Sequence, residues 1–251
     1  MNTELMARAV PELLLGLPLT LQLVVLSLAI GFALAVPLAL MRLSHNPILF
    51  GPAYAYSFFF RGTPLLVQIF LIYYGLGQFA GIRGSFLWPF LREPFWCAVL
   101  ALTLNTAAYT SEIIRGGIQA VPHGQVEAAQ ACGMSPVLIF RRIVFPQAIR
   151  QALPAYGNEV ILMVKSSSLA SVITLLEVTG LARRLIAQTY APLEVFIVAG
   201  AIYLLLNFIL TRIFALIERR LMVDAVARPK GGAGTPASAG AGPVATAAPD
   251  H

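Results

Sequence analysis

Long apolar stretches separated by short polar connections dominate the chain. Charged residues are absent from Leu13 to Met41, from Gly62 to Ile82 and from Val195 to Thr211. A helix needs about 20 consecutive apolar residues to cross the hydrocarbon core of a bilayer. We therefore predict an all-α, polytopic membrane protein. Its five transmembrane helices are expected at about residues 14–41, 57–80, 95–117, 152–173 and 195–216.

The flanks of this membrane domain, residues 16–221, differ from it. Residues 1–15 are predicted to be an N-terminal segment on the outer side. The first apolar run exceeds the core of a signal peptide, which indicates a retained span. From Leu175 to Leu193 the pattern is amphipathic, typical of either a short helix at the outer surface or a plain loop. Residues 222–251 become rich in Gly, Ala, Pro, Ser and Thr and are predicted to be a disordered cytoplasmic tail.

The charges indicate the class of protein and its orientation. Apolar residues make up 58% of the sequence and charged residues 11%, whereas about a quarter of a soluble domain is charged. The net charge of +6 is explained by arginines in alternate loops, which favour the cytoplasmic side, without nucleic acid as a partner. The N-terminus is therefore predicted outside, and loop 121–150 and the C-terminus inside. Placing Arg61 within a span leaves this prediction unchanged.

The sequence lacks a nucleotide site of its own. A phosphate-binding loop of the type G-x-x-x-x-G-K-[ST] needs lysine after glycine, and neither Lys165 nor Lys230 follows a glycine. Cys97 and Cys132 are expected on opposite sides of the membrane, and no Cys/His spacing fits zinc. We expect no metal or cofactor in this chain. Its energy must come from a partner or from an ion gradient.

The longest polar connection, residues 121–150, has the pattern of two short helices joined by a turn. Pro122 suits a first helical position, and Gly133 suits a left-handed helix stop. Ser135 followed by Pro136 is typical of a helix start. An amphipathic loop lying on the membrane surface is the alternative that composition alone leaves open.

The spacing of residues in this loop carries a resemblance. Glu127, Ala128, Ala129, Gly133 and Pro146 are spaced as in the EAA loop of permease subunits of ATP-binding-cassette (ABC) importers, although Phe145 replaces the leucine that this family usually has before the proline. The resemblance implies the ABC type-1 permease fold. It also implies that the loop is the coupling helix, which docks on a cytoplasmic ATPase subunit.

Further stretches resemble the polar amino-acid branch of these permeases, from about Gly16 to Leu221. They are Arg61–Gln68, Leu104–Ile113, Arg115–Gly124 and Ala152–Glu159. Residues 121–124 and 158–163 look like permeases for histidine, lysine, arginine and ornithine, or for octopine and nopaline.

This resemblance implies a permease subunit of a basic or polar amino-acid importer in the bacterial inner membrane, with a periplasmic N-terminus. The implied partners are a second permease subunit, forming a homo- or heterodimer, a periplasmic amino-acid-binding protein, the ATPase and membrane lipid. ATP and magnesium would belong to the ATPase.

Polar residues in the third span are candidates for a substrate path. Asn105, Tyr109 and Glu112 share one helical face, and an amide and a phenol beside a carboxylate could bind an ammonium or basic side chain. A charged group in a span must face protein or water. Glu112 pairing with Arg115, one turn later, is the structural alternative.

The fourth span adds Asn158, Glu159 and Lys165. Glu159 and Lys165 point to different faces of a helix and cannot pair within it. We predict that Glu159 lines the path, while Ser166, Ser167 and Ser168 serve interhelical bonding and packing. Lys165 facing a cationic substrate would repel it, so it faces away, acts as a gate, or the substrate is not basic.

Two other classes of function remain as alternatives. An ion-coupled secondary amino-acid carrier could use Glu112, Glu159 and Lys165 as a proton relay; such carriers often contain inverted repeats, and the sequence shows none. An intramembrane enzyme would need a nucleophile and base or a metal cluster, which the spans do not supply.

Overall fold

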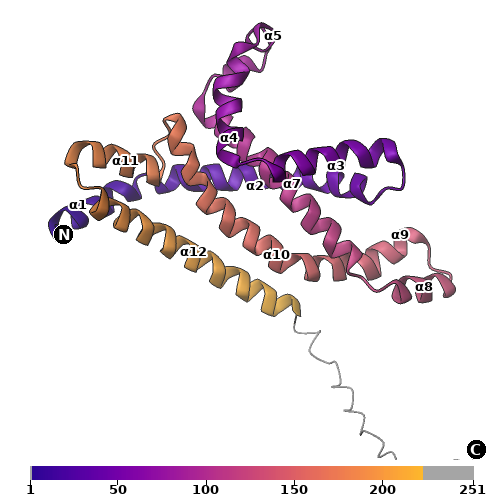
Figure 1. The fold of residues 1–251 in the computed structure, drawn as a ribbon. Helices are drawn as coiled ribbons and strands as arrows, with labels where there is room; N and C mark the ends of the chain where they lie inside the picture. Colours follow the sequence, from indigo (N-terminus) through magenta and orange to yellow (C-terminus); the bar gives the residue numbers. More distant parts are fainter. Residues whose placement is uncertain (1, 223–251) are drawn as a thin grey trace, which may run out of the picture.

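The structure is a computed structural model that describes residues 2–222, and every regular element in that range is a helix (Figure 1). The predicted tail lies outside the described residues, apart from Met222. The elements are α1 (Thr3–Leu14), α2 (Leu17–Leu43), α3 (Pro47–Gly62), α4 (Leu65–Phe70), η1 (Leu71–Gly75), η2 (Leu76–Gln78), α5 (Ala80–Arg83), α6 (Trp88–Leu91), α7 (Pro94–Gln119), α8 (His123–Ala131), α9 (Pro136–Ile139), η3 (Phe140–Val144), α10 (Phe145–Ser166), η4 (Ser167–Ile173), α11 (Val178–Thr189) and α12 (Pro192–Met222).

Three helices, α2, α7 and α12, are individually long and apolar enough to cross a membrane. Two bent pairs also pass this test: α3 with the segment Leu65–Gln78, and the segment Pro136–Ile173 with α11. The bends are 104° and 47°. The described residues therefore contain three candidate spans by length and composition, or five if each bent pair counts as one. The predicted all-helical membrane fold is confirmed.

The packing of α2 on α7 forms the centre of the molecule. The two helices approach so closely that a side chain at Gly31 would collide with Thr106. Ser27 contributes a second small side chain, whose hydroxyl donates to the carbonyl of Val99 at 3.5 Å. Small residues at such positions let backbones approach, which is how helices associate in lipid. Leu23, Val24, Ile69, Cys97, Leu102 and Val164 belong to the apolar core around this contact.

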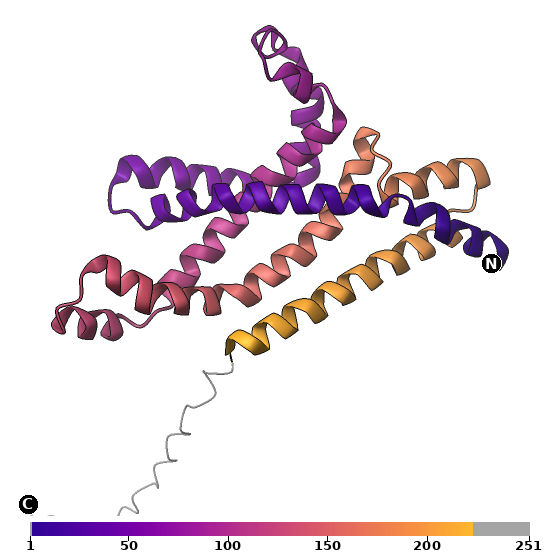
Figure 2. The same cartoon turned by 180° about the vertical axis from the view of Figure 1, so that it is seen from behind.

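The second predicted span differs from the structure because it is not a continuous helix. α3 ends at Gly62, Thr63 is extended with φ −111° and ψ 146°, and α4 begins after Pro64. Proline has no N–H to donate and disfavours helical geometry in the residue before it. As a result the chain turns sharply, and α4 and α5 rise from the layer that α2 and α3 form, as both views show (Figures 1 and 2).

The first span also starts later than predicted. α1 occupies most of the predicted N-terminal segment, and α2 begins after Gly16. A side chain at Gly16 would lie 2.6 Å from the backbone of Glu177 and Val178, so the break fits against the start of α11. α11 itself falls within the amphipathic stretch and supports the short-helix interpretation. A second apolar cluster joins α1, α11 and α12 and includes Leu13, Val178, Leu185 and Val195.

The two ends of the molecule are formed by different helices, and one end contains a buried carboxylate. α8 and α9 lie at the end opposite α1 and α11, and the view from behind agrees (Figures 1 and 2). At the α11 end, the fully buried Glu177 caps the helix. Its carboxylate accepts the N–H groups of Thr179 and Gly180, both at 2.9 Å, and the hydroxyl of Tyr203 at 2.7 Å. Every oxygen of this buried carboxylate is therefore occupied, as a dry interior requires.

Candidate functional site

The candidate coupling loop is a helix, a tight turn and a second helix. α8 begins one residue later than predicted, with Pro122 as its N-cap. Gly133 has φ +74°, the left-handed conformation that its position predicted. The N–H of Gly133 bonds the carbonyl of Gln130 at 2.9 Å, and the N–H of Met134 bonds that of Ala129 at 3.1 Å. This pair of bonds is a Schellman motif, which ends a helix sharply and satisfies its last carbonyls.

The predicted docking residues of this loop are presented on the surface. Glu127, Ala128, Gly133 and Pro146 are exposed, while Ala129 is buried. A surface made mainly of small side chains next to a carboxylate allows another protein to approach the backbone closely. Docking of an ATPase through these five residues stays a prediction.

Side chains beneath the loop attach it to the spans. Gln147 donates from Nε2 to Oε1 of Gln125 at 2.6 Å and to the carbonyl of Ile143 at 3.0 Å, which joins α8 to α10. A Cβ at Gly117 would lie 2.7 Å from the carbonyl oxygen of Ala148, so α7 and α10 are in backbone contact here. The loop is therefore bonded to α10, and α10 packs directly against α7.

Glu112 lies in a cluster of arginines. It accepts from Nε of Arg42 at 2.8 Å and from Nε and Nη2 of Arg115 at 2.9 and 2.7 Å. Nη1 of Arg61 lies 3.9 Å away. The Glu112 side chain is 12% exposed. The Arg115 pair that the sequence left open is therefore present, and Arg42 from α2 is a partner that sequence spacing does not show.

Aromatic rings complete this cluster. The guanidinium of Arg42 lies over the rings of Phe50 and Tyr54, at 4.9 and 4.8 Å from their centroids, and that of Arg61 lies 5.4 Å from the Tyr109 ring. Such cation–π contacts favour a charge that is partly removed from water. The cluster therefore fixes α2 and α3 to the end of α7 that leads into the coupling loop.

Asn105 closes the bend between α3 and α4. Its amide donates to the carbonyl of Phe60 at 3.2 Å and to Oε1 of Gln68 at 3.1 Å. Gln68 in turn donates to the carbonyl of Phe60 at 2.9 Å and to the hydroxyl of Thr63 at 2.8 Å. Backbone groups freed by a break in a membrane helix must find partners inside the protein. Both amides serve this need, and the sequence singled out only Asn105.

Glu159 and its neighbours point in different directions. Glu159 is 6% exposed and accepts the hydroxyl proton of Thr106 at 2.8 Å, whereas Asn158 and Lys165 are exposed. Within residues 2–222 neither Glu159 nor Lys165 forms a salt bridge with another side chain. Glu159 thus meets α7 at the height of the Gly31 contact. Whether it or Asn158 lines a substrate path stays a prediction.

Two of the three serines after Lys165 form hydrogen bonds within their own segment, whereas bonds between helices were predicted. Ser167 donates to the carbonyl of Val164 at 2.7 Å, and Ser168 to that of Lys165 at 2.6 Å. Serine hydroxyls bond nearby carbonyls readily, and here α10 tightens into the 3₁₀ helix η4. These hydroxyls therefore stabilise a change of helix type.

The candidate residues do not form a relay. Glu112 is held by arginines, Glu159 by Thr106, and Lys165 is exposed. In the described part of the chain, no group of three His, Cys, Asp or Glu side chains could hold a metal ion. The arrangement is that of a helical membrane scaffold with an exposed loop at one end.

Relatives with named transport roles match most of the chain. The octopine transport system permease protein OccM of Rhizobium meliloti is 66% identical over 206 residues, which cover 82% of this chain and 84% of that protein. The nopaline transport system permease protein NocM of Agrobacterium fabrum is 61% identical, covering 87% and 91%. The histidine/lysine/arginine/ornithine transport system permease protein HisM of Escherichia coli is 44% identical, covering 82% and 87%.

Solved structures agree with the fold. A chain of an amino acid ABC transporter crystallised with histidines superposes with a TM-score of 0.79 at 39% identity, covering 88% of this chain and 99% of the other. A chain of the inward-facing MetNI methionine ABC transporter gives 0.63 at 19% identity, covering 86% and 96%, and supports the fold alone. Residues 27–223 match the family described as binding-protein-dependent transport system inner membrane component. This chain belongs to that family.

Proposed function

We propose that this chain is the permease subunit of an ATP-driven importer of basic or polar amino acids. The observation that carries the proposal is the coupling loop, a Schellman-terminated helix that is exposed at one end of the molecule, in a sequence without a phosphate-binding loop. The names of the relatives support an amino acid or its octopine- or nopaline-like derivative as substrate.

The proposed complex contains two permease subunits, a cytoplasmic ATPase that binds ATP and magnesium, and a periplasmic binding protein. The chain lies in the inner membrane with its N-terminus outside and the α8 loop in the cytoplasm. ATP binding to the ATPase moves α8, and this movement passes into α7 and α10 through Gly117 and Gln147. The spans then turn from inward-open to outward-open, and substrate released by the binding protein enters.

Purification of the tagged chain from native membranes in mild detergent tests this proposal. We expect a P-loop ATPase in the sample, and a second permease chain if the complex is a heterodimer. After reconstitution with the binding protein, labelled arginine or octopine should enter proteoliposomes only when ATP is present on the ATPase side. Uptake by this chain alone, driven by an ion gradient without ATP, would contradict the proposal and support the secondary carrier.

A further inference from the structure

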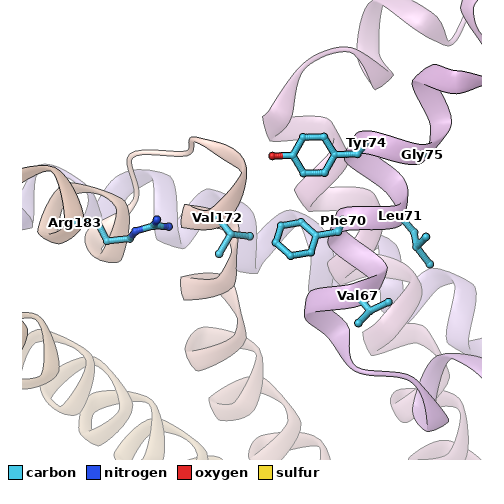
Figure 3. A pocket seen from close by; sticks show the side chains of 7 residues that line it. All are labelled: Val67, Phe70, Leu71, Tyr74, Gly75, Val172 and Arg183. Carbon is cyan, nitrogen blue, oxygen red and sulfur yellow. The ribbon is translucent and has the colours of Figure 1, made fainter.

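A pocket of about 680 Å³ lies between the α4–η1 segment and the η4–α11 segment (Figures 1 and 3). The pocket is wide open to the surface, and most of the side chains that line it are exposed. The residues that line it are Val67, Phe70, Leu71, Tyr74, Gly75, Val172 and Arg183. None of them is among the residues that the sequence singled out as a substrate path.

Two departures from α-helical geometry meet at this pocket. Leu71, Tyr74 and Gly75 belong to the π-helix η1, and Val172 belongs to the 3₁₀ helix η4. π-Helical turns occur frequently at functional sites. In some transporters interrupted helices line the substrate site. Here two continuous helices change their geometry where they line the pocket. The backbone therefore marks this pocket independently of its side chains.

The side chains place one cation opposite two aromatic rings. Figure 3 shows Arg183 and the rings of Phe70 and Tyr74 directed toward one another from their two segments, with Val172 between them. Phe70 and Tyr74 are one helical turn apart, with ring centroids separated by 5.8 Å. Arg183 is exposed and donates to the carbonyl of Ser171 at 3.2 Å. Within residues 2–222 it forms no salt bridge.

These groups complement the two ends of a basic amino acid. A guanidinium binds carboxylates through paired N–H groups, and it repels a second cation. Aromatic faces attract ammonium and guanidinium groups within about 6 Å of the ring centroid. A ligand with a carboxylate at one end and a cation at the other would therefore enter in one orientation.

We propose that this pocket recognises the amino-acid substrate, with Arg183 binding its carboxylate and the Phe70 and Tyr74 rings contacting its cationic side chain. The inference rests on the proposed transport function and adds to it the residues that bind the substrate. It also removes an objection to a basic substrate, since Lys165 is exposed but is not part of this pocket.

The test measures binding of labelled arginine to the whole complex in nanodiscs, without the binding protein. Competition by unlabelled arginine is compared with competition by agmatine, which is arginine without its carboxylate. In the wild-type complex arginine should compete at least tenfold better than agmatine. Arg183→Gln should lose this preference because the carboxylate has no partner, and Arg183→Lys should keep part of it. Arg184→Gln is the matched control, because Arg184 is the next residue on α11, is also exposed and does not line the pocket.

A second variant, Tyr74→Leu, keeps the inference testable if Arg183→Gln does not fold. Tyr74 is 57% exposed, so Tyr74→Leu should leave assembly intact. It should reduce the preference for arginine over citrulline, its uncharged isostere, severalfold. An unchanged agmatine ratio in Arg183→Gln, or no arginine binding by a wild-type complex that transports, would overturn the inference alone. A wild-type complex without ATP-driven uptake would overturn the proposed function as well.

Discussion

The coupling loop and the polar interior of the spans use the same residue types in opposite ways. In the loop, Glu127 is exposed and the turn at Gly133 is closed by backbone bonds to residues three and five positions earlier. In the interior, Glu112 and Asn105 are largely buried, and their partners include Arg42 and Phe60, which lie 70 and 45 residues away. The turn of the loop is thus closed by local backbone bonds, and Glu127 stays exposed. The interior uses its polar groups to hold distant segments together.

Among the changes proposed here, Glu112→Gln should reduce the stability of the folded spans most. It leaves three arginines around a neutral amide, and losing one member of a buried ion pair costs about 3–5 kcal/mol. Thermal unfolding of the purified protein in detergent should show a large loss of stability. Glu93→Gln is the control, because Glu93 forms an exposed pair with Arg92 at 3.6 Å and such pairs contribute about 0–1 kcal/mol. Equal shifts of the unfolding temperature in the two variants would contradict the role of Glu112 in holding the arginine cluster together.

Asn105→Ala should have a smaller effect on the same region. It removes a donor to the carbonyl of Phe60 and leaves Oε1 of Gln68 without this bond. A buried polar group left unsatisfied costs about 1–3 kcal/mol. Asn105→Ala in combination with Gln68→Leu should be less destabilising than the sum of the single changes, since neither amide is then stranded. A double-mutant cycle from unfolding midpoints measures this coupling, and strict additivity would argue against the contact.

Gly133→Val should act on the loop while sparing the spans. A residue with a Cβ in the left-handed region costs about 1–2 kcal/mol, and valine is poorly suited to it, so the end of α8 should shift. We expect ATPase recovery and ATP-driven uptake to fall at normal expression. Gly133→Asn is the matched variant, because asparagine tolerates this conformation, and it should retain most activity. If Gly133→Val takes up substrate at the wild-type rate, the loop does not couple ATP hydrolysis to transport.

Chemical labelling of the two cysteines should distinguish the exposed loop from the interior of the spans. Cys132 is exposed next to Gly133, whereas Cys97 is buried in α7. A membrane-impermeant maleimide should therefore label one thiol, only when it has access to the cytoplasmic face, and Cys132→Ser should abolish labelling. Modification of intact cells from outside would reverse the predicted orientation.

The sequence predicted what depends on neighbouring residues. The long apolar runs, the turn at Gly133 and the small-residue loop all follow from local spacing, and each is present in the structure. The sharp bend after α3 was missed because Thr63 and Pro64 interrupt an otherwise uncharged apolar run. A proline within that run was the available signal.

Long-range partners could not be read in this way. The contacts of Arg42 with Glu112 and of Thr106 with Glu159 join residues 70 and 53 positions apart. Arg183 resembles any other loop cation until the fold brings it opposite Tyr74. These pairings depend on how the helices cross, which periodicity along one helix does not specify.

The attachment beneath the coupling loop has a mechanical consequence. Residues 117–148 form a segment that is closed by two contacts. One is the backbone contact between Gly117 and Ala148, and the other is the hydrogen bond between Gln125 and Gln147. α8 is thus bonded to α10, and α10 is in direct backbone contact with α7. We therefore expect the ends of α7 and α10 next to the loop to move together when α8 is displaced.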